Sequence, residues 1–203
     1  MQRPTIELVI FEAANGRRPF VDWFDRLRDR VAQAAVVQRL DRLQSGNPGD
    51  CRSLGGGLIE LRVDTGPGYR VYLSRFKADA TVRYRKGEEM AGRRKKALKP
   101  MKQRTRRAAL SYDQWLRARL AADPDLSVEY LRQVLEQFET PEELLLGLRR
   151  VAEVLGMSRV AEVAGLSRES LYRSLSAAGN PRLSTLVAVL RVAGLRLSVR
   201  PAA

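Results

Sequence analysis

Three arginines and one tyrosine in the first half of the sequence have the types and spacing to handle a phosphate group. Arg62 lies in GGLIELRVD, and Arg70 and Tyr72 lie in YRVYLSRF; both runs alternate apolar and polar residues as half-buried strands do. This alternation places Arg62 and Arg70 on one polar sheet face, with Tyr72 beside Arg70. Arg52, in the expected loop before these strands, could also reach that face. The alternative for each arginine is a solvated strand face.

A second set of residues has the spacing of a helix-turn-helix. The segment SRVAEVAGLSRESLYRSLSAAGNPRL places Ala161 where two helices would cross and Gly165 at the turn between them. Apolar anchors for the core follow at Val160, Ala164, Leu166, Leu171 and Leu175. We expect the second helix to expose Arg168, Glu169, Ser170, Tyr172 and Arg173 to base edges, with Ser167 and Arg182 placed for phosphates. An ordinary helical hairpin is the alternative.

The charge of the chain favours nucleic-acid partners. Its 203 residues carry 37 basic and 23 acidic side chains, a net charge of +14, and Arg93–Arg107 contains no acid. Because there is no histidine, proton transfer must use Lys, Arg, Tyr, Asp or Glu, and we expect neither a metal nor a cofactor. The longest apolar runs are too short for a membrane span. The single Cys51 excludes an internal disulfide, which fits a cytoplasmic protein.

Periodicity divides the sequence into an α+β part followed by an all-α part. The first part reads as a strand at Thr5–Phe11, one long helix or an α-hairpin from Pro19 to Ser45, the two strands above, and a strand at Ala80–Tyr84. This order predicts a small antiparallel sheet with two helices on one face. The expected domains are residues 1–92 and 111–203, joined by a basic junction at 93–110.

The second part reads as helices ended by a short strand, LRLSV. The predicted helices are Tyr112–Ala121, Asp123–Gln137, Pro141–Leu155, Arg159–Ala164, Arg168–Ala177 and Ser184–Ala193. Asp123, Thr140 and Ser167 are the expected N-caps, the first two followed by proline at the first helical position.

This second part also resembles a known family. The stretches SYDQWLRARLAADPDLSVEYLRQVLEQ and GLSRESLYRSLSAAGNPRLSTL resemble the HigA-type antitoxins of addiction modules, over about residues 101–199. The resemblance implies a helix-turn-helix that represses its own promoter and an N-terminal part that contacts a toxin. It makes toxin-facing candidates of Trp115, Leu116, Leu120, Tyr130 and Leu131, for which plain core is the alternative.

The first part resembles the partner of such an antitoxin. The stretches VDWFDRLRDRVAQAAVVQRLDRLQSGNPGD and LGGGLIELRVDTGPGYRVYLSRF resemble HigB-like toxins of the RelE/ParE superfamily. Members that are ribonucleases cleave mRNA, often on the ribosome, without a metal. The resemblance then implies that Arg62 and Arg70 stabilise the negative charge of the transition state. Arg52 would position the RNA backbone, and Tyr72 would stack on a base or transfer a proton. Relatives of the ParE type poison gyrase with the same fold.

The sequence fits this toxin pattern through Ala80–Val82 and departs from it afterwards. The toxins continue with an apolar strand and a Gly-Gly-Asp-Lys-like loop, whereas this chain reads ATVRYRKGEEMAGRRKKALKP. We therefore expect the activity of the toxin part to be attenuated. A shifted reading frame is a hypothesis for the origin of this segment. The leading interpretation is a fused toxin–antitoxin chain, homodimeric on a palindromic operator. The alternatives are an active mRNA endoribonuclease inhibited in cis and a DNA-binding regulator with an inactive toxin-like platform.

Overall fold

The computed structural model describes residues 6–76, 79–84 and 110–198. Its contacts divide the chain into two compact units, Met1–Leu116 and Arg117–Ala203, which are described separately below. The predicted basic junction at 93–110 lies outside the described residues except for Leu110. No helix in the described ranges is long and apolar enough to cross a membrane.

The region from Pro19 to Ser45, expected as one long helix or an α-hairpin, forms two helices. Helix α1 spans Pro19–Arg26 and α2 spans Arg30–Gln44, so the α-hairpin alternative is confirmed. The break has a local cause. Asp29 caps α2 by accepting hydrogen bonds from the backbone N–H groups of Val31 and Ala32, at 2.9 and 3.2 Å.

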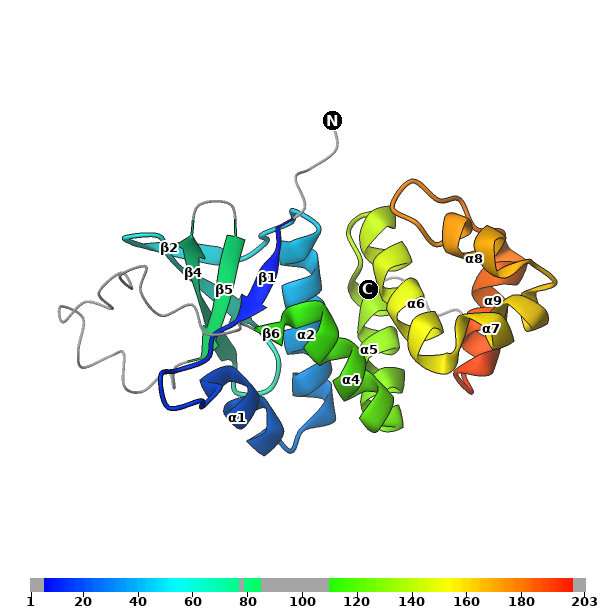
Figure 1. The fold of residues 1–203 in the computed structure, drawn as a ribbon. Helices are drawn as coiled ribbons and strands as arrows, with labels where there is room; N and C mark the ends of the chain where they lie inside the picture. Colours follow the sequence, from blue (N-terminus) through cyan, green and yellow to red (C-terminus); the bar gives the residue numbers. More distant parts are fainter. Residues whose placement is uncertain (1–5, 77–78, 85–109, 199–203) are drawn as a thin grey trace. The chain divides into compact units, whose positions relative to one another are not determined.

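The sheet of the first unit has the order β2-β3-β4-β5-β1-β6 (Figure 1). Its strands are β1 (Leu8–Ile10), β2 (Cys51–Gly55), β3 (Leu58–Val63), β4 (Tyr69–Phe76), β5 (Asp79–Tyr84) and β6 (Leu110–Ser111). The expected small antiparallel sheet is confirmed from β2 to β5, whereas β1 pairs with β5 in parallel. The sequence missed β2 and β6, so Arg52 lies in a strand and not in a loop.

The core of this unit lies between the sheet and its helices. Leu61 and Val63 of β3 and Val71 and Leu73 of β4 are buried, as the period-two alternation predicts. The helices contribute residues of their own, and Phe20, Phe24, Val36, Val37 and Leu40 are all fully buried. The expected α+β layer is therefore present, and it leaves Arg62 and Arg70 partly exposed.

Helices make up the described part of the second unit. Helix α4 spans Tyr112–Ala122 and begins in the first unit; it is followed by α5 (Pro124–Gln137), α6 (Pro141–Leu155), α7 (Met157–Ala164), α8 (Arg168–Ser174) and α9 (Leu183–Val192). The predicted caps are confirmed: Asp123 accepts from the N–H of Leu126 at 3.1 Å, and Thr140 from that of Glu143 at 3.4 Å.

The predicted final strand, LRLSV, is wrong for its described residues. Leu195–Ser198 belong to neither a helix nor a strand. Gly194 ends α9 with a φ of 75°, and the N–H of Leu195 donates back to the carbonyl of Leu190 at 2.8 Å. Among the described residues from Arg117 onward there is no strand with which LRLSV could pair. An alternating pattern alone therefore did not produce a strand.

Candidate functional site

Helices α7 and α8 are joined by the short turn that the sequence predicts. Gly165 has the left-handed φ of 65°, which glycine adopts without strain. The N–H groups of Gly165 and Leu166 donate to the carbonyls of Glu162 and Ala161, at 3.1 and 2.9 Å. Ala161 is buried, as expected for a small residue where helices pack closely. The turn thus has both residues that a helix-turn-helix requires.

Ser167 starts α8 as its N-cap. Its Oγ accepts a hydrogen bond from the N–H of Ser170 at 3.1 Å. Hydrogen bonding lowers the pKa of the Glu169 carboxyl below its ordinary value of 4.5, first from the backbone N–H of Glu169 and then from the side chain of Ser167, with a smaller contribution from the charge of Arg168. The first turn of α8 is therefore ordered at its exposed end.

The residues expected at a DNA surface fall on the outside of α8 and the loop that follows it. Leu171 and Leu175 anchor the helix in the core and are buried. The polar residues share the opposite side: Ser167, Arg168, Glu169, Arg173 and Arg182 are exposed, and Ser170 and Tyr172 are partly buried. The arrangement brings together six of these seven candidates within Ser167–Arg173, and Arg182 caps α9 further along the chain.

An arginine of α6 adjoins this surface and is itself linked to α4, which the sequence did not reveal. The guanidinium carbons of Arg149 and Arg168 lie 5.5 and 5.7 Å from the centre of the Tyr172 ring. Arg149 also pairs with Glu153 at 3.1 Å, and Arg117 pairs with the same carboxylate at 2.9 Å. The contacts of Arg149 with Tyr172 and of Arg117 with Glu153 join residues far apart in sequence, so no local pattern predicts them.

The polar face of the sheet brings the four candidates of the first unit around one glutamate. In the strand register Arg62 is opposite Arg70, while Glu60 is opposite Tyr72 on one side and Arg52 on the other. Residues directly opposite in neighbouring strands have adjacent side chains. Sequence alternation placed Glu60 on this face, but gave no sign that it would be the centre of the group.

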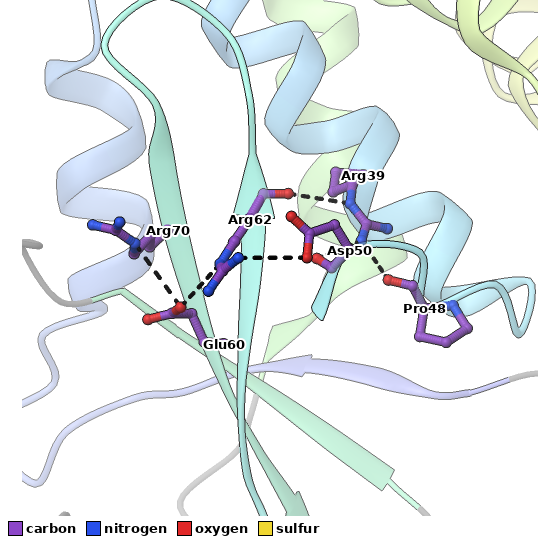
Figure 2. A network of polar contacts seen from close by, with 6 residues as sticks. All are labelled: Arg39, Pro48, Asp50, Glu60, Arg62 and Arg70. Carbon is purple, nitrogen blue, oxygen red and sulfur yellow. Dashed lines mark hydrogen bonds and ion pairs between the residues drawn. The ribbon is translucent and has the colours of Figure 1, made fainter. Parts of the chain in front are cut away.

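Glu60 contacts three of its neighbours, and Figure 2 shows its contacts with Arg62 and Arg70. Its Oε1 lies 3.3 Å from Nε of Arg62 and 3.9 Å from Nε of Arg70. The hydroxyl of Tyr72 donates to Oε2 at 3.1 Å. Tyr72 is only 2% exposed, so little of its ring is available for stacking on a base. Any anion binding to these arginines competes with a carboxylate that already lies between them.

A buried arginine of α2, which the sequence does not predict, bonds to the backbone at the end of this sheet face. Nε of Arg39 donates to the carbonyl of Arg62 at 3.2 Å, and Nη2 donates to the carbonyls of Asp50, at 2.8 Å, and Pro48 (Figure 2). The Asp50 carboxylate in turn lies 3.8 Å from Arg62. Gly49 packs so closely that a Cβ there would meet the Arg39 guanidinium at 2.9 Å. Helical periodicity alone gives no hint of this role.

Neither surface offers a conventional metal site. Within the described ranges, no group of three or more His, Cys, Asp or Glu residues could hold a metal ion. The chemistry of the sheet face is that of arginines, one tyrosine and carboxylates, while the α8 surface carries two arginines and a glutamate suited to base edges and phosphates.

The C-terminal region matches a family of antitoxins. Residues 116–201 match the model of a family described as a probable addiction module antidote protein, which supports an antitoxin-type domain in this region. A protein of Haemophilus influenzae, described only as uncharacterized, is 48% identical over 54 residues, or 27% of this chain. The chain spans about half of that relative, 54% of its length. No solved structure matches, and the family match lends no support to the toxin resemblance of the first half.

Proposed function

We propose that this chain is a toxin–antitoxin polypeptide whose second unit binds operator DNA and represses its own promoter. The antidote-family match over residues 116–201 supports the antitoxin role. The observation that carries the DNA-binding part is the α7–α8 turn, in which a left-handed Gly165 and the Ser167 cap leave the polar side of α8 exposed. A helix presented in this way enters the major groove by its N-terminal residues.

Each exposed side chain has a role in this proposal. Arg168 and Arg173 donate to guanine, and Glu169 accepts from the amino group of cytosine. Ser167 and Arg182 bind phosphates and fix the register of the helix on the duplex. A homodimer suits a palindromic operator, since a two-fold protein reads two half-sites about one helical turn apart. This function belongs in the cytoplasm, where the operator is.

The neutralising role follows from the fusion. The α+β unit is the toxin-like partner, and its covalent link to the antitoxin-type region gives the two a high effective concentration. The surface of the toxin-like unit is then rarely free, even if the two units bind each other only weakly when they are separate.

Operator binding by the full chain tests the proposal. Fluorescence anisotropy with a duplex from upstream of the coding sequence should show binding that weakens as salt rises and exceeds binding to a scrambled duplex. Arg173→Ala should lower the specific free energy of binding by about 1–3 kcal/mol. Arg132→Ala on α5 is the matched control, because that exposed arginine is already paired with Glu129 and Glu136. Equal binding to both duplexes would contradict the proposal.

A second candidate function, metal-independent cleavage of mRNA, is favoured by one observation. Arg62 and Arg70 are direct cross-strand neighbours, so their two guanidinium groups are placed to bind one phosphate together. The carboxylates of Glu60 and Asp50 lie against Arg62, which supports the view that the activity is attenuated. If the full chain and its first unit leave RNA intact, the α+β unit is a platform and the regulator remains.

A further inference from the structure

Seven residues, from the last of the basic junction onward, complete the first unit. Leu110–Leu116, here called the docking segment, consist of β6 and the first turns of α4. Strand β6 pairs antiparallel with β1, with Leu110 opposite Ile10 and Ser111 opposite Val9. Strand β1 would otherwise be the edge of the sheet, with a row of unpaired backbone groups.

The helical part of the docking segment inserts aromatic rings into the core. The Trp115 ring meets Phe24 and Phe20 nearly edge to face, at centroid distances of 5.0 and 5.2 Å. Tyr112 and Leu116 have no exposed surface, and Trp115 is 7% exposed. A large aromatic side chain in such a pocket is the kind of residue that dominates binding energy at interfaces.

Polar contacts fix the position of the segment on α2. The hydroxyl of Tyr112 donates to the carbonyl of Val37 at 3.1 Å. The amide of Gln44 donates to both carboxylate oxygens of Asp113, at 3.0 and 3.2 Å. Strand pairing, aromatic packing and directed hydrogen bonds together have the composition of a specific protein interface.

We propose that the docking segment is the site by which the antitoxin-type region holds the α+β unit, so that the two remain bound when the chain between them is cut. The family match begins at residue 116, where the docking segment ends, and α4 runs without a break from Tyr112 to Ala122. The segment is thus covalently continuous with the antitoxin-type region while it packs as part of the first unit. Neutralisation then requires neither α8 nor DNA.

This inference rests on the proposed function only in giving the C-terminal region its antitoxin role. The occupant of the surface is the chain's own Leu110–Leu116.

The experiment cuts the folded full chain. A recognition sequence for a specific protease is inserted between Pro100 and Met101, and the purified protein is cleaved without denaturant. We expect the two fragments to elute together from a sizing column, at the mass that the uncut protein shows on the same column. Fragments that separate on dilution to nanomolar concentration would overturn the inference.

Two variants test the named contacts. Trp115→Ala should raise the dissociation constant of the cut protein about thirtyfold or more, and Tyr112→Phe, which keeps the packing and removes one hydrogen bond, about fivefold or more. Tyr112→Phe decides the matter if Trp115→Ala fails to fold. Phe138→Ala is the control, because it truncates an exposed ring of the same fragment and should change nothing. Equal effects of Tyr112→Phe and Phe138→Ala would refute the assignment.

Operator binding separates this inference from the proposed function. If the fragments separate while the uncut chain still binds its operator specifically, the docking inference fails and the regulator stands. If the fragments stay together while specific DNA binding is absent, the proposed function fails and the docking stands.

Discussion

Glu60 controls the charge of the sheet face. Three possible phosphate ligands surround it, and it contacts Arg62, Arg70 and Tyr72 through its two oxygens. A carboxylate in this position neutralises part of the positive charge that would attract RNA. The face is therefore less basic than its arginines alone suggest.

Replacing Glu60 with glutamine should increase the affinity of the full chain for single-stranded RNA. The side chain keeps its shape and can still accept from Tyr72, while the face gains one unit of positive charge. The plot of log K against log salt should steepen by about 0.7, as expected for one further phosphate contact. Anisotropy over a salt series measures this. Glu136→Gln removes the same charge from an exposed site on α5, and an equal change there would show that only total charge matters.

Replacing Ser167 with alanine should destabilise the second unit and change its response to acid. Loss of the N-cap costs about 1 kcal/mol, to be measured by urea unfolding. Because the pKa of Glu169 is lowered in the fold, its carboxylate favours folding above the unfolded pKa, and that contribution disappears as pH falls through the folded pKa. In Ser167→Ala the pKa of Glu169 should rise toward 4.5, which an NMR titration would follow. The control Ser184→Ala, in the first turn of α9, should leave the pKa of Glu169 unchanged.

At the scale of the element, α5 and α6 approach closely because Gly147 has no side chain at their contact. A Cβ at Gly147 of α6 would lie 2.6 and 2.8 Å from the two methyl carbons of Val134, which is buried on α5. Contacts this short force a side chain or a helix to move. Gly147 is thus a packing residue, although glycine in a helix interior normally lowers stability.

Gly147→Ala should therefore destabilise the protein although alanine is the better helix former. We expect a net loss of up to about 2 kcal/mol, since overpacking costs about 1–3 kcal/mol and helix propensity returns about 1 kcal/mol. Val134→Ala in the same chain removes the colliding methyls and should recover part of the loss, which a double-mutant cycle by chemical denaturation would show. A higher melting temperature for Gly147→Ala alone would contradict the close approach.

Elements with local signals were predicted well from the sequence, and those with distant partners were not. The N-caps Asp123, Thr140 and Ser167 are set by residues three positions away, and all three were predicted. Strand β6 has two residues and exists because β1 lies beside it, so no periodicity could reveal it. The same reason hid Arg39, whose three acceptors lie in the chain from Pro48 to Arg62.

At the scale of the whole molecule, the first unit needs residues from beyond the basic junction. Residues 1–100 lack β6 and the buried Tyr112, Trp115 and Leu116, each of which contributes about 1.5–3 kcal/mol on burial. That loss is comparable to the stability of about 5–15 kcal/mol that a domain possesses. An α+β unit that ended before the docking segment would be at the margin of folding.

A chain of residues 1–122 should fold where residues 1–100 do not. The longer chain contains all of α4, and it should show a cooperative urea transition and resist limited proteolysis. The shorter chain should be digested rapidly under the same conditions. Residues 1–122 with Trp115→Ala provide an intermediate case. Equal resistance of the two lengths would show that the docking segment adds little to the unit.

The position of β1 between β5 and β6 also orders events during synthesis. The first strand to leave the ribosome pairs on one side with β5 and on the other with Leu110–Ser111. Translation of residues 85–109, which separate those partners, takes about 1–5 s at roughly 5–20 residues per second. The sheet is therefore completed only when synthesis of the antitoxin-type region has begun. The order of the chain itself therefore delays completion of the α+β unit until residues beyond the basic junction have been made.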